Sequence, residues 1–163
     1  MKISICMASY NGSKFIKNQI TSILSQLAKG DQLVIVDDCS SDGTVKIIES
    51  LKDPRIKLFK NTKNIGVVGT FNRALNNANG DIIFLSDQDD EWLDNKVSFI
   101  RNFFLTNNID MVVHDAKIME GGNIVTNSLF EQIGSSGGLF KNIYSNSYTC
   151  LLYTSDAADE EDS

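Results

Sequence analysis

The sequence predicts an α/β fold in which helices cover both faces of a mostly parallel sheet. Strand-like and helix-like segments alternate from the N-terminus, and the strand-like segments are short apolar runs that suit strands buried on both faces. Three of these runs end in polar clusters, which a parallel sheet would gather at one edge because its strands share a direction. The 163 residues, 42% hydrophobic and 22% charged, fit one globular domain with a substantial core.

The strands are predicted from apolar runs that stop at turn-forming or acidic residues. Residues 3–8 read ISICMA before Ser9, and residues 33–36 read LVIV before Asp37 and Asp38. By the same criterion, further strands are expected at residues 56–59 (IKLF), 82–85 (IIFL) and 111–113 (MVV), with a hairpin over residues 118–125.

The helices are predicted from apolar residues that recur every three or four positions. The first, over residues 15–27, is closed by Gly30, and capping residues 40–44 precede a second over residues 45–51, whose exit is marked by Pro54. The residues expected to face inward are Phe15, Ile16, Ile20, Ile23, Leu24 and Leu27 in the first helix, Val68, Phe71, Leu75 and Ala78 in a third, and Val97, Ile100, Phe103 and Phe104 in a fourth.

The net charge excludes a general affinity for nucleic acid. The formal charge is −6, but five of the twenty-one acids lie within residues 156–162, and residues 1–150 carry fifteen bases against sixteen acids. Such a body has no basic excess to attract a polyanion. Cys6, Cys39 and Cys150 show no CxxC spacing, so neither a disulfide framework nor a zinc site is indicated, and we expect a cytoplasmic setting without a signal peptide or membrane span.

The most informative stretch is residues 82–92, IIFLSDQDDEW, where an apolar run turns abruptly acidic. Asp87, Asp89 and Asp90 would lie beyond the carboxyl end of a buried strand, where open α/β sheets bind their ligands. Carboxylates crowded there repel one another unless they share a cation, and Mg²⁺ or Mn²⁺ prefers such oxygen ligands, with a substrate phosphate completing its shell. A solvated acidic turn is the alternative interpretation.

Together the polar clusters favour recognition of a nucleotide diphosphate, with an aromatic face for the base, an acid for a base N–H and carboxylates for the metal. A dinucleotide site is disfavoured because Asn11-Gly12-Ser13 does not supply the G-x-G-x-x-G pattern, and a P-loop is absent. A phosphatase with an aspartate nucleophile would need lysine and serine or threonine steps that are not visible. The three clusters are Ala8-Ser9-Tyr10-Asn11, Asp37-Asp38 and Asp87-Gln88-Asp89-Asp90.

Four segments, ISICMASYNGSKFI, LVIVDDCSSDGT, NIGVVGTFNRAL and GDIIFLSDQDDEWLDNK, resemble in order and spacing the motifs of the family-two inverting glycosyltransferases. The resemblance runs from Ile3 to about Val125 and implies a GT-A (Rossmann-like) fold, incomplete at the C-terminus, with residues 1–149 as a partial nucleotide-sugar-binding domain. The SDQDD-x-W-x-x-x-K variant resembles a bacterial branch that includes rhamnosyltransferases of cell-surface polysaccharide assembly. A UDP- or dTDP-sugar donor, a glycan or lipid-linked acceptor, and a location in the cytoplasm or at the cytoplasmic face of the inner membrane follow from this resemblance.

The resemblance also implies roles for individual residues. Asp87 and Asp89 would form the DxD pair, with Asp89 as the metal ligand and Asp87 on the ribose or sugar side, so both are candidate catalytic and metal-binding residues. Trp92 is expected to pack, and His114 to lie at a strand end instead of on a metal. The donor-binding residues would be Ala8 and Tyr10 around the base, Asp38 accepting from the pyrimidine N–H, Asn64 and Gly66 beside the nucleotide-sugar, and Ser9, Asn11, Asp87 and Gln88 around them.

Two expectations concern the C-terminal part of the chain. Inverting transfer needs a general base, which the family supplies from an acidic motif beyond the residues that resemble it, so we expect the base to be missing from this chain. Asp115 is a candidate residue on the acceptor side. Residues 150–160, CLLYTSDAADE, resemble a translated sequencing adapter, and we expect residues 150–163 to be a non-native, disordered tail. The chain would then be the donor-binding half of an enzyme, with a non-catalytic nucleotide-sugar-binding module as the alternative.

Overall fold

A computed structural model describes residues 1–120 and 123–132, and it divides the chain into two compact units, Met1–Ile109 and a second that begins at Asp110. The first unit is an α/β layer structure built on a four-stranded, all-parallel sheet in the order β3-β2-β1-β4. The prediction of a parallel sheet between helices is confirmed. Its elements are β1 (Ile3–Ser9), α1 (Ile16–Leu24), β2 (Gln32–Asp37), α2 (Thr44–Ser50), β3 (Ile56–Lys60), α3 (Gly66–Leu75), β4 (Ile82–Ser86) and α4 (Lys96–Thr106).

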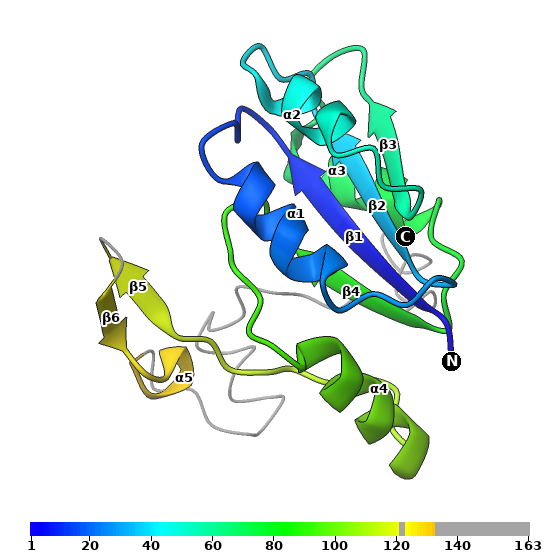
Figure 1. The fold of residues 1–163 in the computed structure, drawn as a ribbon, viewed down its shortest axis with the longest axis vertical. Helices are drawn as coiled ribbons and strands as arrows, with labels where there is room; N and C mark the ends of the chain where they lie inside the picture. Colours follow the sequence, from blue (N-terminus) through cyan, green and yellow to red (C-terminus); the bar gives the residue numbers. More distant parts are fainter. Residues whose placement is uncertain (121–122, 133–163) are drawn as a thin grey trace, which may run out of the picture. The chain divides into compact units, whose positions relative to one another are not determined.

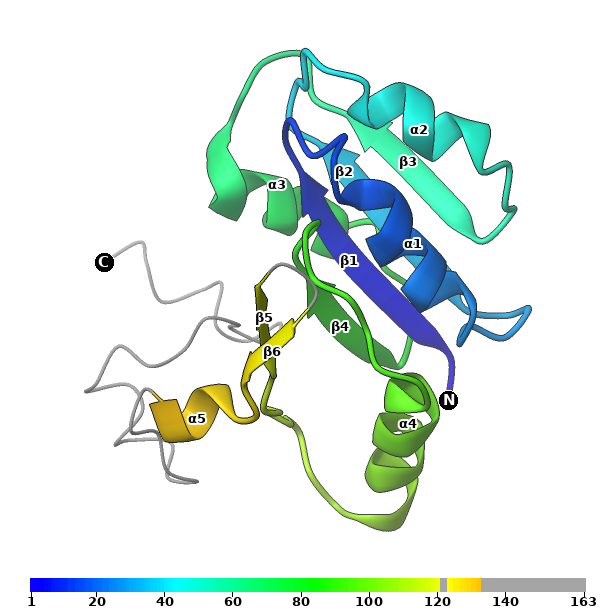
Figure 2. The same ribbon diagram turned by 60° about the vertical axis from the view of Figure 1, so that its left-hand side comes forward.

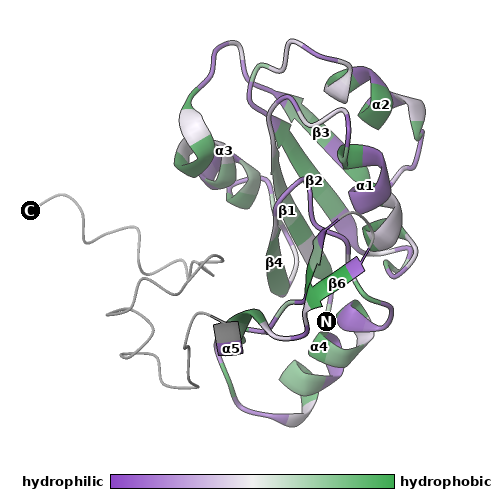
Figure 3. Ribbon diagram, turned by 90° about the vertical axis from the view of Figure 1, so that its left-hand side faces the viewer, coloured by the Kyte–Doolittle hydropathy of each residue, from purple (hydrophilic) through white to green (hydrophobic). Residues whose placement is uncertain are grey.

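Helices lie on both faces of this sheet. Helices α1 and α2 cover one face and contact each other, whereas α3 lies against β1 and β2 on the other (Figures 1 and 3). Strands β1 and β2 are buried along almost their whole length, and the sheet is coloured hydrophobic over most of its area in Figure 3. Both faces of the central strands are therefore covered, which explains why their sequences are continuous apolar runs without alternation.

The order of the strands reverses beside β1. The chain adds β2 and β3 on one side of β1 and then returns to place β4 on the other side (Figure 2). Gly80 permits this return because a Cβ there would lie 2.5 Å from the backbone nitrogen of Ser4 in β1. In open α/β sheets, the crevice between the carboxyl ends of two strands at such a reversal is the usual ligand site.

Several predicted inward-facing side chains prove to be exposed. Phe15 precedes the first residue of α1 and is 45% exposed, and Val68, in the first turn of α3, is 68% exposed because Thr70 and Ala74 make that helix's buried face. Phe103 of α4 stacks on Phe99 instead of entering the core, whereas Val97 and Ile100 are buried as expected. None of the helices in the described ranges combines the length and apolar character needed to cross a bilayer.

The second unit contains an antiparallel pair, β5 (Ile118–Glu120) and β6 (Asn123–Thr126), followed by the single turn α5 (Leu129–Gln132). The predicted hairpin over residues 118–125 is confirmed, but the predicted strand over residues 111–113 is wrong, because that segment has no regular structure. A strand needs a neighbour for its N–H and C=O groups, and in the described part of this unit β5 and β6 pair only with each other. The tail expected at residues 150–163 lies outside the described residues.

Candidate functional site

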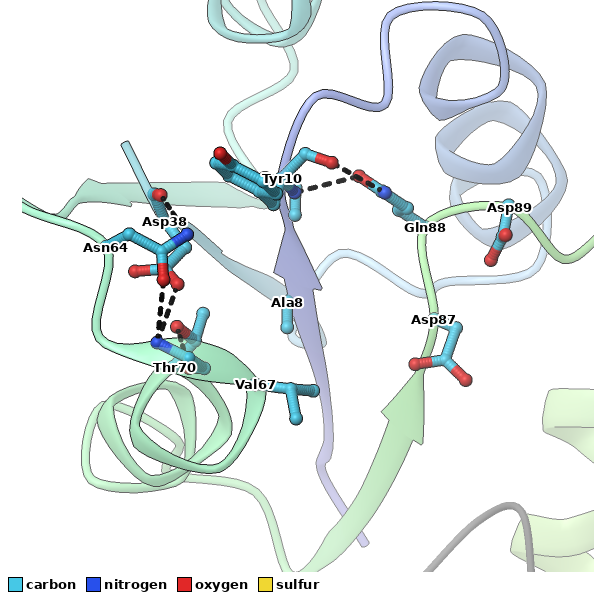
Figure 4. Close-up of a pocket in the computed structure, with 11 residues that line it drawn as sticks. Ala8, Tyr10, Asp38, Asn64, Val67, Thr70, Asp87, Gln88 and Asp89 are labelled. Carbon is cyan, nitrogen blue, oxygen red and sulfur yellow. Dashed lines mark hydrogen bonds between the residues drawn. The ribbon is translucent and has the colours of Figure 1, made fainter. Parts of the chain in front are cut away.

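A cavity of about 350 Å³ lies at the carboxyl ends of β1 and β4, at the reversal of strand order (Figure 4). Its volume falls within the range of about 300 to 1,000 Å³ that is usual for small-molecule sites. All of the predicted site residues except Asn11 and Asp115 line it, and Val67 and Thr70, which the sequence analysis missed, complete the wall contributed by α3. The lining residues are Ala8, Ser9, Tyr10, Asp38, Asn64, Gly66, Val67, Thr70, Asp87, Gln88 and Asp89.

Asp38 is buried and holds the start of α3 against the end of β2. Its Oδ1 atom accepts hydrogen bonds from the backbone N–H of Ile65 and from Nδ2 of Asn61, at 2.9 and 2.8 Å, and its Oδ2 atom accepts one from the N–H of Gly66 at 2.9 Å. Burial by itself would raise the pKa of Asp38, but these donors and Thr70 outweigh it and hold the pKa below its usual value. The carboxylate is therefore ionised and caps α3, while its contact with a base N–H stays a prediction.

Tyr10 and Gln88 tie the ends of β1 and β4 together across the cavity. The backbone N–H of Tyr10 donates to Oε1 of Gln88, and Nε2 of Gln88 donates to the carbonyl of Tyr10, both at 3.0 Å (Figure 4). The Gln88 amide lies so close to Gly12 that a Cβ at that position would collide with it. These two hydrogen bonds use only the backbone of Tyr10, whose side chain is 48% exposed, so its ring is available for stacking on a planar ligand.

Asp87 and Asp89 project from the turn that follows β4 (Figure 4). Partial loss of water around its carboxyl group, together with the negative charges of Asp90 and Asp89, raises the pKa of Asp87. In the part of the chain that the structure describes, no three His, Cys, Asp or Glu side chains gather closely enough to hold a metal ion by themselves. The donor set therefore fits a hard divalent cation that takes two carboxylates from the protein and the rest of its shell from a phosphorylated ligand.

Asn11 and Asp37 stabilise the loops beside the cavity instead of lining it. The backbone N–H of Ser41 donates to Oδ1 of Asn11 at 2.9 Å, which ties the turn after β1 to the loop after β2. Asp37 is buried and accepts hydrogen bonds from the hydroxyls of Ser9 and Ser40. Asn11 was predicted as a donor-binding residue because of its sequence position, and the structure places its side chain in this loop contact.

Asp115 lies in the second unit, in the loop before β5. Its Oδ1 atom accepts hydrogen bonds from the N–H groups of Ala116 and Phe130, at 2.8 and 2.9 Å. Burial would raise the pKa of Asp115, but these donors together with Ser128 and Leu129 lower it, which weakens the carboxylate as a base.

Two further predictions concern Trp92 and His114. Trp92 was expected to pack, and it is 6% exposed with its ring centroid 5.3 Å from that of Phe84. His114 was expected at a strand end and instead occupies an irregular segment.

Thr70 and Val67 were not found from the sequence because α3 reads as a core helix. The hydroxyl of Thr70 donates to the carbonyl of Gly66 at 2.7 Å, one turn earlier, which allows this polar side chain to be buried. A buried threonine in the second turn after a cavity-lining glycine could have been recognised as part of the wall, but an exposed valine such as Val67 carries no such signal.

This geometry, an acidic turn and an aromatic face around the reversal point of a parallel sheet, defines an α/β domain with a candidate ligand site at the carboxyl ends of its strands. The chain belongs to glycosyl transferase family 2, whose model matches residues 4–160. It is 35% identical over 140 residues, 86% of its own length, to the Escherichia coli UDP-Glc:alpha-D-GlcNAc-diphosphoundecaprenol beta-1,3-glucosyltransferase WfgD, and 34% identical over 97 residues to the Bacillus subtilis putative teichuronic acid biosynthesis glycosyltransferase TuaG, which covers 58% of this chain. The chain spans 55% of WfgD and 38% of TuaG.

Solved structures share the fold. S. aureus TarS 1-349 in complex with UDP superposes with a TM-score of 0.62 at 29% identity, over 65% of this chain and 32% of that one, and the same protein in complex with UDP-GlcNAc gives 0.62 at 28%, with the same coverage of both chains. The mannosyltransferase PcManGT from Pyrobaculum calidifontis, in complex with GDP-Man and Mn²⁺, gives a TM-score of 0.55 at 25% identity over 59% of this chain and 30% of its own. The predicted family and the GT-A fold are thus confirmed.

Proposed function

We propose that this chain forms the donor-binding part of a glycosyltransferase that moves a sugar from a UDP- or dTDP-sugar to a glycan or lipid-linked acceptor, with inversion, in cell-surface polysaccharide synthesis. The observation that carries the proposal is the cavity at the strand reversal, which brings Tyr10, Asp38 and the Asp87/Asp89 pair together. TarS is described with UDP and UDP-GlcNAc, WfgD is named for a UDP-Glc donor and a diphosphoundecaprenol-linked acceptor, and TuaG for teichuronic acid biosynthesis. These names support a nucleotide-sugar donor and a glycan or lipid-linked acceptor.

Different residues of the cavity would contact different parts of the nucleotide-sugar donor. The exposed ring of Tyr10 offers a stacking face for the base, and the small side chain of Ala8 leaves room at the end of β1. The ionised Asp38 lies beside Asn64 and Gly66 at the start of α3, where the base and ribose would contact the wall. Asp87 and Asp89 would hold Mg²⁺ or Mn²⁺, which when bound neutralises the negative charge of the pyrophosphate as it leaves.

Proton removal from the acceptor hydroxyl needs a further group. Asp115 is bound by backbone N–H groups of its own unit and has a lowered pKa, so it is a poor general base. We therefore expect nucleotide-sugar binding and slow donor hydrolysis from this chain, without efficient transfer. A non-catalytic nucleotide-sugar-binding module would share the binding but not the hydrolysis.

Thermal unfolding with UDP, dTDP and GDP, with and without Mn²⁺, tests the proposal. A nucleotide at about one hundred times its dissociation constant should stabilise the folded chain by about 2.7 kcal/mol, and UDP or dTDP with Mn²⁺ should give the largest shift. Asp89→Asn should abolish the part of the shift that depends on Mn²⁺, whereas Asp94→Asn, the same charge change outside the cavity, should preserve it. Absence of any shift with every nucleotide and metal would refute a donor site.

A further inference from the structure

Helix α1 and the turn that follows it carry three polar side chains, Gln19 and Ser22 in the helix and Gln26 in the turn, that contact the segment after β4. We call these three residues the polar seam. Their spacing of three and four positions places them on one face of the helix or its immediate continuation. Gln19 is 0% exposed, although glutamine is rarely found fully buried. A leucine in its place would extend the apolar face of α1, so the amide must satisfy some other requirement.

Gln19 is bonded to the residues that lead into the acidic turn. Its Nε2 atom donates to Oγ of Ser86 at 2.7 Å and to the backbone carbonyl of Asp87 at 3.1 Å, and its Oε1 atom lies 3.2 Å from the hydroxyl of Ser22. Both N–H groups of the amide thus have acceptors, while its oxygen shares the single hydroxyl hydrogen of Ser22 with the backbone carbonyl of Gln19, which lies 2.9 Å from that hydroxyl. The two donated hydrogen bonds fix the backbone that they contact, because displacing it would leave the buried N–H groups unpaired.

Ser22 and Gln26 hold the other side of the same turn. The hydroxyl oxygen of Ser22 accepts a hydrogen bond from the backbone N–H of Trp92 at 3.0 Å. The amide of Gln26 donates to the carbonyl of Leu93 and accepts from the N–H of Val97, both at 3.1 Å. The segment from residue 86 to residue 97 is therefore attached to α1 by Gln19 and Ser22, and to the turn after α1 by Gln26, with Asp89 and Asp90 between the attachments of Gln19 and Ser22.

We infer that the polar seam of α1 positions the acidic turn for metal binding, with Gln19 as its principal positioning residue. The inference rests on the proposed function, since it assigns the metal to Asp87 and Asp89. The seam does not touch the ligand: it fixes the direction in which the main chain leaves β4 and thereby the separation of the two carboxylates. Residues that orient metal-binding side chains typically change metal affinity about 10- to 100-fold when they are replaced.

The chain provides a matched control for Gln19 and a local reporter of the turn. Gln32, 7% exposed, uses its Nε2 atom in the same way at the opposite end of the sheet, donating to Oγ of Ser4 at 2.9 Å and to the carbonyl of Asn77 at 3.4 Å. The only tryptophan of the chain, Trp92, is part of the segment that the seam holds, so its fluorescence reports on this segment alone.

The experiment compares Gln19→Met, Ser22→Ala and Gln32→Met in the 163-residue chain. Acrylamide quenching of Trp92 and Mn²⁺ binding in the presence of UDP, followed by the electron paramagnetic resonance of free Mn²⁺, are measured for each. Gln19→Met should make Trp92 about twofold easier to quench and weaken Mn²⁺ binding about 10-fold, with UDP affinity in the absence of metal changed less than about twofold. Ser22→Ala should change Trp92 quenching and Mn²⁺ affinity in the same directions by less. Ser22→Thr, which keeps the hydroxyl, should leave both near their wild-type values.

Gln32→Met should lose about as much thermal stability as Gln19→Met, but its Trp92 quenching and Mn²⁺ affinity should stay near those of the wild type. Equal quenching of Trp92 in Gln19→Met and Gln32→Met would contradict the inference that the polar seam holds the acidic turn in place. Greater quenching of Trp92 in Gln19→Met with unchanged Mn²⁺ affinity would show that the polar seam stabilises the segment without positioning the metal ligands, and would overturn the inference. A wild-type chain that binds neither UDP nor Mn²⁺ would instead refute the proposed function and the metal assignment, while the quenching comparison would still decide whether the seam holds the turn. If Gln19→Met fails to fold, Ser22→Ala against Ser22→Thr makes the same test.

Discussion

Asp31, at the amino end of the sheet, and Asp87, at its carboxyl end, have pKa values shifted in opposite directions. At the amino end, Asp31 accepts hydrogen bonds from the N–H groups of Ile3 and Ala28 and pairs with Arg101; burial raises its pKa, but these partners lower it by more. At the carboxyl end, partial loss of water around the carboxyl group and the charges of Asp90 and Asp89 raise the pKa of Asp87, although its side chain is exposed. The fold thus stabilises the Asp31 carboxylate, as it stabilises that of Asp38 at the start of α3, whereas it destabilises that of Asp87. A cation bound at the acidic turn would relieve the repulsion on Asp87.

The largest effect expected from this division is on donor turnover. Asp89→Asn should lower Mn²⁺-dependent release of UDP from a UDP-sugar by about 100-fold, because loss of charge stabilisation at the leaving group typically costs this much. Its unfolding temperature should stay within about 1 °C of the wild type, since the side chain is exposed. The assay measures UDP release per folded molecule. Unchanged release with Asp89→Asn would show that this carboxylate does not hold the metal.

The amino end should show the reverse pattern. Asp31→Ala removes the acceptor of two backbone N–H groups and the partner of Arg101, and we expect it to lower the free energy of unfolding by about 2 to 3 kcal/mol. The unfolding temperature should fall by roughly 4 to 12 °C, at about 2 to 4 °C per kcal/mol for a chain of this size. Calorimetry and UDP affinity are measured on the same sample. A loss of UDP affinity in the folded variant would break the separation of the two ends.

Much of this division could be predicted from the sequence. The acidic cluster after residues 82–85 and its place at one edge of a parallel sheet, together with two other polar clusters, were predicted from short apolar runs that end in polar residues. The reversal of strand order beside β1 was not predicted. The contacts of Asp31 and Gln19 were not, because both depend on residues far away in the chain, Arg101 and Ser86. A buried polar side chain on an apolar helix face shows that a partner exists, but only the fold shows which one.

The errors in the predicted core have a similar cause. Helical spacing assigned Val68 inward because it lies three positions before Phe71 in the series Val68, Phe71, Leu75 and Ala78, yet the first turn of α3 extends to the cavity, where neighbouring Val67 lines the wall. Apolar residues that contact a ligand and apolar residues that contact the core follow the same periodicity. The strand expected at residues 111–113 failed because pairing, which the sequence does not show, decides whether three apolar residues become a strand.

The acid dependence of the free energy of unfolding should also distinguish Asp31 from Asp87. Asp31 has a lower pKa in the folded chain than in the unfolded chain, so the unfolded state binds more protons as the pH falls. Its stabilisation is present above its unfolded pKa of about 4 and is lost as the pH falls through the folded pKa. The difference in unfolding free energy between the wild type and Asp31→Asn, from urea titrations, should therefore be constant between pH 6 and pH 7 and shrink at acid pH. A difference that grows on acidification would contradict this assignment.

The smallest expected effect is that of Asp87→Asn on the free energy of unfolding, and its sign is opposite to that of Asp31→Ala. Asp87→Asn removes one of the mutually repelling charges of the acidic turn, and because this side chain is exposed and screened by solvent, the metal-free chain should be stabilised by only about 0.2 to 0.5 kcal/mol, or roughly 1 °C. The order should invert when Mn²⁺ and UDP are added, because the ligands then stabilise the wild type and not the variant. Asp81→Asn, an exposed acid that accepts from the N–H of Lys2 at the amino end, is the control and should show neither the gain nor the inversion. Destabilisation of the metal-free chain by Asp87→Asn would mean that the fold stabilises this carboxylate as it does Asp31, and the contrast between the two ends would be lost.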